Sequence, residues 1–216
     1  MILDLHSHSV RSDDGRAKVE NYCQWIRKRE LPLDGFVLTE HRQYDATSDY
    51  RALEDEFDLL ILKASEVETE YGHVLLFGVN EGLVHAFDFS RVDLPLAEVV
   101  RQARRHDAIA VPCHPGRTKV GMCAHYDVRG PVEGVEVIET LNGGSRGTEN
   151  DEAIALASAY GYRGVGGSDA HIVSFIGRCA TRFDNDVASV EDLVRELRGG
   201  AFEALSFKDQ ALEARS

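Results

Sequence analysis

The sequence predicts an α/β fold built on a mostly parallel sheet, either open or closed into a barrel. Short apolar segments of strand length recur along the chain, and amphipathic segments at helical spacing lie between several of them. The length of 216 residues suits one domain with a sizeable core. We expect that domain to span residues 1–209, with a flexible C-terminal tail over 210–216.

Eight segments are expected to be strands, because each is short and largely apolar. In chain order they are residues 2–5, 35–39, 59–66, 73–79, 108–113, 135–140, 163–166 and 178–183. Four segments with apolar residues at helical spacing are expected to be helices. They are residues 17–29, 96–105, 148–160 and 190–197. Residues 117–131 are expected to form the longest irregular connection.

Composition limits the possible partners. Apolar residues make up 43 % of the chain and charged residues 28 %, which is typical of soluble globular proteins. No basic stretch precedes an apolar run at the N-terminus, and no apolar run approaches the ~20 residues of a membrane span. The four cysteines form no C-x-x-C pair. We therefore expect a cytoplasmic protein with reduced thiols and no membrane partner.

The net charge of −13 argues against a broad electrostatic grip on nucleic acid, which needs a basic face. It is compatible with a small anionic substrate if the site itself supplies positive charge. No feature of the sequence predicts an oligomeric state.

Histidines and acidic residues gather at the predicted strand ends. In a parallel α/β barrel, the residues that follow the strands converge on one face, where active sites lie. The first two, in "HSH", point the same way from an extended segment, so both imidazoles can reach one metal ion. Metal ions would also neutralise the carboxylates of such a cluster. The residues concerned are His6, His8, Glu40, His41, Glu66, His73, His114, Glu139, Asp169 and His171.

Six motifs in this order resemble the PHP superfamily, the polymerase and histidinol phosphatase proteins. They are "DLHSHS", "TEH", "SEVETEYGHVLLFG", "CHPG", "VIETLNG" and "GGSDAH", and the match runs from Leu3 to about Arg182. One such motif alone is weak, whereas the ordered combination is highly specific. The resemblance implies a distorted (β/α)7 TIM-like barrel of the PHP type. It also implies two or three divalent metal ions at the C-terminal face of the barrel.

The same resemblance implies the ligands of a first metal ion. It would be held by His6, His8 and Asp169 together with Glu66, which would bridge to a second ion. Mixed imidazole and carboxylate ligation suits Zn²⁺, Mn²⁺ or Fe²⁺.

The second and third ions would be held by the remaining motifs. His73 and His114 would complete the second site, while Asp13, His41 and His171 would form the third. Together with the first site, these residues make nine metal-ligand positions, and all nine are filled.

Two positions depart from the family pattern. Many members have Thr-Asp-His where this chain has "TEH", and we expect Glu40 to orient the neighbouring imidazole. The family often has Ser-Asp-Gly where this chain has "SDDG". Counting from His8 selects Asp13 as the ligand, with Asp14 as the alternative.

This site predicts a metal-dependent phosphoesterase acting on a small phosphorylated metabolite or nucleotide. Three carboxylates facing three divalent ions leave about +3 of charge, and facing two ions about +1. In an otherwise acidic protein, such a positive site favours an anion such as phosphate. The expected reaction is in-line attack on phosphorus by a metal-activated hydroxide. We expect Glu66, Asp169 and His171 to take part in catalysis.

Four further residues are expected to contact the substrate. Arg117 follows "CHPG", Arg146 lies in the glycine-rich "NGGSRG", and Arg178 follows the "SDAH" loop. His125 lies in the connection 117–131, and long loops at a catalytic rim commonly set specificity.

Three alternatives stay open. The same metal ions could hydrolyse a C–N or C–O bond, as in amidohydrolase barrels, although those commonly use a bridging lysine where this chain has Glu66. A degenerate module that only binds a partner would be expected to have lost ligands, and none is missing. A nuclease or proofreading role is disfavoured by the acidic charge and by the absence of a polymerase segment.

Overall fold

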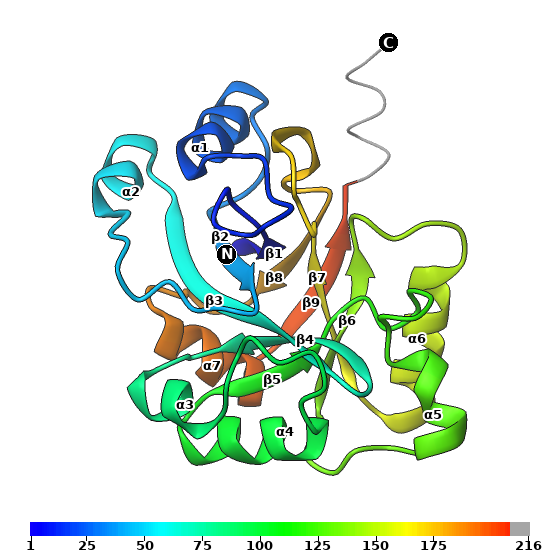
Figure 1. Ribbon diagram of the computed structural model, residues 1–216. Coiled ribbons are helices and arrows are strands. Elements are labelled where there is room, and N and C mark those ends of the chain that lie inside the picture. The colour runs from blue at the N-terminus through cyan, green and yellow to red at the C-terminus, as the bar shows by residue number, and fades with distance from the viewer. Residues whose placement is uncertain (208–216) are drawn as a thin grey trace.

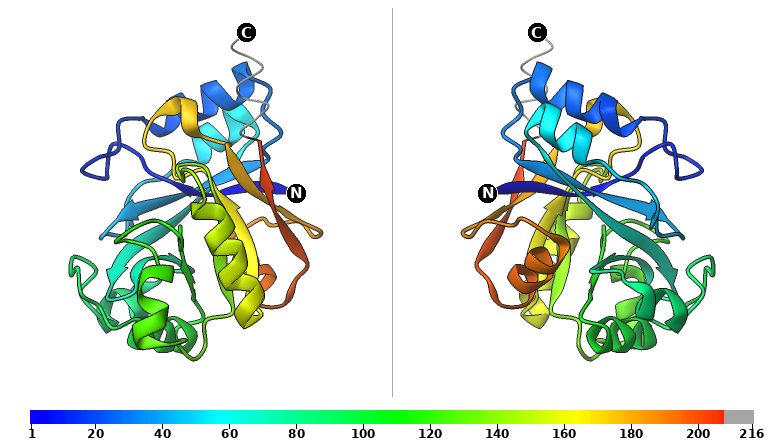
Figure 2. Two further views of the ribbon diagram at one scale, coloured as in Figure 1. Left: turned by 90° about the vertical axis from the view of Figure 1, so that its right-hand side faces the viewer. Right: turned by 90° about the vertical axis from the view of Figure 1, so that its left-hand side faces the viewer.

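The computed structural model describes residues 1–207 as a strongly curled sheet surrounded by helices (Figures 1 and 2). Seven strands form one sheet in the order β5-β4-β3-β2-β1-β8-β9, and β6 and β7 form a second sheet. A parallel bridge between Ser7 and Ala170 links the end of β1 to the segment after β7. The predicted tail, 210–216, lies outside the described residues.

The strands are β1 (Ile2–Ser7), β2 (Gly35–His41), β3 (Leu60–Thr69), β4 (Gly72–Phe77), β5 (Ile109–Pro112), β6 (Val137–Asn142), β7 (Arg163–Gly167), β8 (Cys179–Phe183) and β9 (Phe202–Ser206). The helices are α1 (Val19–Lys28), α2 (Arg51–Phe57), α3 (Glu81–Ala86), α4 (Leu96–Arg105), α5 (Cys123–Arg129), α6 (Glu149–Tyr160), α7 (Val190–Gly199) and the 3₁₀ turn η1 (Val173–Phe175). Figures 1 and 2 show α1 and α2 side by side at one end of the molecule, and α4 and α5 at the other.

The mixed α/β class is confirmed, but the prediction of a mostly parallel sheet is wrong. The pairs β1–β2, β2–β3 and β6–β7 are parallel. By contrast, β4 is antiparallel to β3 and β5, and β8 is antiparallel to β1 and β9. Only residues 70–71 separate β3 from β4, and a parallel crossover needs about a dozen residues. The count of seven β/α units is not confirmed, because residues 1–207 form nine strands in two sheets.

All eight predicted strands and all four predicted helices are present, and α4 has both ends as predicted while the others have at least one end shifted. The sequence did not predict β9 or the helices α2, α3 and α5. Helix α2 has only seven residues and none is fully buried, although Leu53 and Phe57 pack partly buried against a core cluster. The connection 117–131 is not wholly irregular, since it contains α5.

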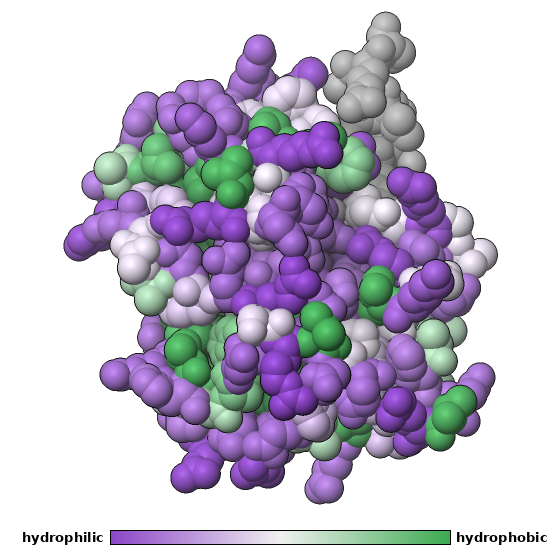
Figure 3. Space-filling view, viewed as in Figure 1, coloured by the Kyte–Doolittle hydropathy of each residue, from purple (hydrophilic) through white to green (hydrophobic). Residues whose placement is uncertain are grey.

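Apolar side chains fill the interior of the curled sheet at the end away from the predicted site. Phe77 ends β4 and Ile109 begins β5, and both belong to the same buried cluster as Leu193 and Leu197 of α7. Figure 3 shows an outer surface that is mostly hydrophilic on this face, with small separate apolar patches. None of the helices in residues 1–207 is long and apolar enough to cross a membrane.

Candidate metal centre

The structure brings the imidazoles of all six predicted histidine ligands to one end of the curled sheet. His6 lies in β1, which is followed by His8, and His41 ends the parallel strand β2. Because β4 runs antiparallel to β3, His73 near its start reaches the same end. Strand β5 turns back again, so His114 beyond its last residue arrives there too. The antiparallel β4 therefore explains why His73 lies near the start of its strand, whereas His6, His41 and His114 lie near or beyond the ends of theirs.

One buried carboxylate, that of Glu66 in β3, lies between two groups of imidazoles. Its Oε2 is 3.2 Å from His6 Nε2, 3.1 Å from His8 Nε2 and 3.1 Å from His41 Nδ1. Its Oε1 faces a second set of donor atoms. These are His73 Nδ1 at 2.7 Å, His114 Nε2 at 3.2 Å and Cys113 Sγ at 3.3 Å. Each oxygen thus faces its own cluster, as a bridging ligand requires.

The first group consists of His6, His8, Asp169 and one oxygen of Glu66. The two Nε2 atoms are 3.1 Å apart, and each is 3.5 Å from Asp169 Oδ1. Ligands ~2.0–2.1 Å from one ion, at angles of about 90–120°, are separated by about 2.9–3.6 Å. The observed distances of this group fall within that range, so its donors fit a divalent ion.

A third group lies nearer the surface and contains His41, His171 and Asp14. His171 Nε2 is 3.1 Å from Asp14 Oδ2 and 3.3 Å from His41 Nε2. Asp13, the residue selected by counting from His8, instead pairs with Arg42 at 2.8 Å. The structure therefore brings the alternative, Asp14, to the group in place of Asp13.

Two further glutamates hold the ligands in place from outside. Glu139 Oε1 is 3.0 Å from His6 Nδ1, and its Oε2 accepts from the backbone N–H of His114 at 2.7 Å. Glu40 accepts from the hydroxyl of Ser12 at 2.6 Å, and Ser12 Oγ in turn accepts from the N–H of His41 at 3.0 Å. Glu40 is thus linked through Ser12 to the backbone N–H of His41, and its expected role in orienting the imidazole stays a prediction.

The electrostatics of the cluster call for cations. Burial would raise the pKa of the Glu66 carboxyl, but His6, His114 and His73 outweigh it and hold that pKa well below its usual range. Burial lowers the pKa of His8, yet hydrogen bonds to Asp169 and Glu66 outweigh it and raise this pKa to about 9. Without metal ions, imidazolium groups thus supply the positive charge that the buried carboxylates need. Nδ1 of buried His114 has no hydrogen-bond partner in residues 1–207, although buried polar atoms usually have one.

The backbone around the site is strained where ligands must turn inward. His114 and Asp169 have φ values of 33° and 53°, in the left-handed region that residues other than glycine rarely adopt. Gly167 lies against His6, and a Cβ there would come within 2.4 Å of His6 Cβ and 2.7 Å of Glu139 Oε1. The second glycine of "GGSDAH" is therefore required by the close approach of β7 to β1.

Of the predicted substrate residues, Arg117 makes the clearest contact with the cluster. Its Nη2 donates to Asp169 Oδ2 at 2.7 Å and to Asn142 Oδ1 at 3.0 Å. Arg178 stacks over the ring of Phe175, 3.3 Å from its centroid.

The other two predicted substrate residues lie further out. Arg146 is exposed, and His125 on α5 packs edge-on against Tyr71. The structure shows no contact between either side chain and the imidazoles of the cluster.

Two residues beside the imidazoles, Cys113 and Asn142, were not among the predicted site residues. Cys113 was expected only to be a reduced thiol, and its position before "HPG" is the one signal that places it near the site. Asn142, which ends β6, donates to Glu139 Oε2 at 2.8 Å and accepts from Arg117. It lies three residues beyond Glu139 in the "VIETLNG" motif, which was the available signal.

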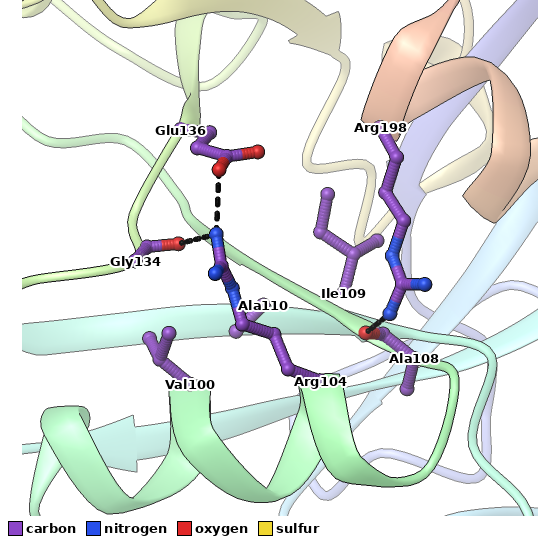
Figure 4. A pocket seen from close by; sticks show the side chains of 8 residues that line it. All are labelled: Val100, Arg104, Ala108, Ile109, Ala110, Gly134, Glu136 and Arg198. Atoms are coloured by element: carbon purple, nitrogen blue, oxygen red, sulfur yellow. Dashed lines mark hydrogen bonds and ion pairs between the residues drawn. The ribbon is translucent and has the colours of Figure 1, made fainter.

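A separate cavity of about 350 Å³ opens at the other end of the strands (Figure 4). Ala108 and Ile109 line it at the start of β5, whereas His114 follows that strand, roughly 20 Å away along the chain. Its arginines already have partners: Arg104 pairs with Glu136, and Arg198 donates to the carbonyl of Ala108. The cavity is thus distinct from the cluster of imidazoles.

A curled α/β sheet with three adjoining groups of imidazoles and carboxylates at one rim defines an α/β-barrel-like protein with a candidate polynuclear metal site. A profile of the PHP-associated family matches residues 147–202. Comparison with curated proteins finds no match.

Three solved structures illustrate the fold. An amidohydrolase from Chromobacterium violaceum, with bound sulfate and no metal, is 16 % identical with a TM-score of 0.63, covering 99 % of both chains. A lesion-specific endonuclease from Pyrococcus furiosus is 15 % identical with a TM-score of 0.65, covering 94 % of this chain but 58 % of the endonuclease. A protein from Bifidobacterium adolescentis, assigned to the metal-dependent phosphoesterases, is 14 % identical with a TM-score of 0.57, covering 92 % of this chain and 96 % of that one.

Residues 147–202 match the PHP-associated family, and the three solved structures share the fold of the chain. The profile match includes the "GGSDAH" motif. The family resemblance found in the sequence is thereby confirmed.

Metal binding is expected to release protons near neutral pH. The pKa of His8 is about 9 in the metal-free protein, so this imidazole is protonated at pH 7 and must lose its proton to bind an ion. Affinity should therefore rise as the pH approaches 9. Calorimetric titration with Zn²⁺ at about pH 7, in buffers of different ionisation enthalpy, should show release of about one proton or more per chain. Proton uptake, or no net exchange, would contradict this assignment of charge.

Asp14 and Asp13 form a matched pair of test sites. Asp14→Asn removes the carboxylate 3.1 Å from His171 Nε2, whereas Asp13→Asn removes only a surface partner of Arg42. After dialysis, the Asp14 variant should lose up to one bound ion per chain relative to the unaltered protein, and the Asp13 variant should lose none. Metal analysis of the purified proteins decides the point, and the opposite pattern would restore Asp13 as the ligand.

Proposed function

We propose that the protein is a metal-dependent phosphoesterase that hydrolyses a small phosphorylated metabolite or nucleotide. The observation that carries this proposal is the buried Glu66 carboxylate, whose two oxygens face two separate imidazole groups beside the guanidinium of Arg117. A bridging carboxylate positions two ions close together, and a nearby guanidinium binds the oxygens of phosphate.

The chain's own donors would hold the ions in three groups. His6, His8 and Asp169 would hold one ion and share Glu66 with a second ion held by His73 and His114. Asp14, His41 and His171 would hold a third. When bound, Zn²⁺, Mn²⁺ or Fe²⁺ polarises phosphoryl oxygens and lowers the pKa of a bound water.

Arg117 is positioned to recognise the phosphoryl group. Asp169 and Asn142 fix one of its nitrogens, and the remaining guanidinium donors are free to face a ligand, since 27 % of the side chain is exposed. Because Asp169 also contacts His6 and His8, the guanidinium lies beside the first group of donors. An anion bound by Arg117 would therefore be held next to the ions.

The substrate is expected to enter over the third group. His6, His8 and His114 are almost wholly buried, with side chains at most 1 % exposed, whereas His171 is 28 % and Asp14 56 % exposed. The rim on that side therefore opens to solvent. His171 would contact the substrate's reacting end, with Asp14 holding its Nε2.

Arg146, Arg178 and His125 would contact the parts of the substrate further from the phosphoryl group. Arg146 lies in the glycine-rich turn after β6, and Arg178 begins the approach to β8 at the same rim. His125 lies on α5 within the connection predicted to set specificity.

Hydrolysis of a C–N bond is a second candidate, supported by the likeness to the Chromobacterium violaceum amidohydrolase over 99 % of both chains. Amidohydrolase barrels commonly bridge their ions with a lysine. Here Glu66 lies at the bridging position, and Lys63 on the same strand donates to the carbonyl of Ser48 instead. This difference favours the phosphoester.

A nucleic-acid substrate is a third candidate, because a lesion-specific endonuclease shares the fold. The chain spans 58 % of that endonuclease, and its net charge of −13 offers few contacts to a phosphate backbone. The acidic charge favours a small substrate.

The substrate class can be tested with a panel. Purified protein loaded with Mn²⁺ or Zn²⁺ should release phosphate from at least one small phosphorylated metabolite or nucleotide. Arg117→Ala should raise KM for that substrate more than it lowers kcat, because the guanidinium binds the anion. Activity confined to amide substrates, or to an abasic DNA duplex, would replace the proposal with the second or third candidate.

Glu66→Gln tests the bridge with little change of shape. The amide keeps one oxygen but loses the negative charge and offers N–H donors to the other cluster. We expect loss of at least one ion per chain and a fall in turnover beyond the ~10–100-fold typical of residues that only support ligands. Circular dichroism should confirm an intact fold. Glu40→Gln, which alters a carboxylate outside the cluster, serves as control, and its turnover should fall no further than that ~10–100-fold. Full metal content and turnover in Glu66→Gln would refute the bridging role.

A further inference from the structure

Cys113 is a buried thiol aimed at the second group of donor atoms. Its Sγ is 3.3 Å from Glu66 Oε1 and 3.4 Å from His114 Nε2. Donor atoms of His6, Glu66, Cys113 and His114 all lie within 4.8 Å of one another, and all four side chains are buried. The PHP resemblance assigns ligands to the other three positions but none to this cysteine.

We propose that Cys113 Sγ is a ligand of the metal ion held by Glu66 and His114. The proposal rests on the proposed function only in requiring that an ion binds there, and it does not depend on the substrate. It adds a sulfur donor to a site that otherwise offers nitrogen and oxygen.

The distances suit coordination. For a Zn–S distance of about 2.3 Å and a Zn–N or Zn–O distance of about 2.0–2.1 Å, angles of about 90–120° separate sulfur from the other donor by about 3.1–3.8 Å. The 3.3 Å and 3.4 Å measured from Sγ fall within this range. The backbone also fixes the residue, because the N–H of Cys113 donates to the carbonyl of His73 at 3.1 Å. The thiol is therefore held between two predicted ligands of the same ion.

Coordination by Cys113 is an exchange of a proton for a metal ion. The S–H bond breaks, the proton passes to solvent, and the sulfur lone pair forms the bond to the ion, with no change of oxidation state. A thiolate is a softer donor than imidazole or carboxylate, so it favours Zn²⁺, Fe²⁺ or Co²⁺ over Mn²⁺ at this position. Cys113 would thus select the metal.

The competing interpretation is that Cys113 only donates a hydrogen bond to Glu66. Cobalt separates the two, because a thiolate ligand gives Co²⁺ an intense near-ultraviolet charge-transfer band that nitrogen and oxygen ligands do not give. We expect the metal-free full-length protein, titrated with Co²⁺, to show this band together with visible d–d bands. Cys113→Ser should lose the charge-transfer band and keep d–d bands. Cys23→Ser, which alters an equally buried cysteine of α1, should keep both.

X-ray absorption at the zinc edge provides a readout that needs no variant. The Zn²⁺-loaded protein should show a sulfur scatterer at about 2.3 Å. Bound Co²⁺ and Zn²⁺ with no charge-transfer band and no sulfur scatterer would overturn the role of Cys113 and leave the proposed function standing. Failure to bind either ion would overturn both, and a charge-transfer band that survives in Cys113→Ser would assign the sulfur to another cysteine and overturn the proposal.

Discussion

The two oxygens of the Glu66 carboxylate organise the whole rim of the molecule. Burying a charged carboxylate without partners is costly, and this one is wholly buried in β3. It persists because each oxygen meets its own set of donors, three imidazoles at Oε2 and two imidazoles with a thiol at Oε1. Five imidazole nitrogen atoms therefore lie within 3.2 Å of the oxygens of one carboxylate. Divalent ions lying between them give the simplest physical answer, since they satisfy both kinds of donor at once.

The strand directions in the sheet bring the donor atoms to Glu66. Strand β4 reverses direction after a tight turn, so His73 enters the cluster from the start of its strand, directly beside Glu66. Strand β5 returns and delivers Cys113 and His114 beside them. At the opposite end of the sheet, apolar side chains of α7 pack with those at the end of β4 and the start of β5. His114 and Asp169 have left-handed backbone conformations, which are strained for residues other than glycine and are held by the surrounding packed structure.

Sequence alone predicted much of this because the ligands lie in short motifs at strand ends, where local periodicity is readable. The strands β1 to β8 and the gathering of six histidines and Glu66 at strand ends follow from that pattern, whereas the metal-ligand roles were implied by the family resemblance. Strand direction did not follow, because it depends on which neighbours pair. Asp14 in place of Asp13 was not predictable by counting, since the loop folds tightly at Gly15, where a Cβ would lie 1.9 Å from the carbonyl oxygen of Ser9. Cys113 directly follows the apolar residues of β5, so its sequence context resembles that of an ordinary core residue.

The position of bound metal ions tests the central claim most directly. Crystals of the protein loaded with Zn²⁺ or Mn²⁺ can be measured above and below the absorption edge of the metal, so that anomalous difference peaks locate each ion. The account predicts one peak among His6, His8, Asp169 and Glu66 Oε2, and a second on the side of Glu66 Oε1. No peak at Glu66, or peaks only at surface carboxylates, would contradict it.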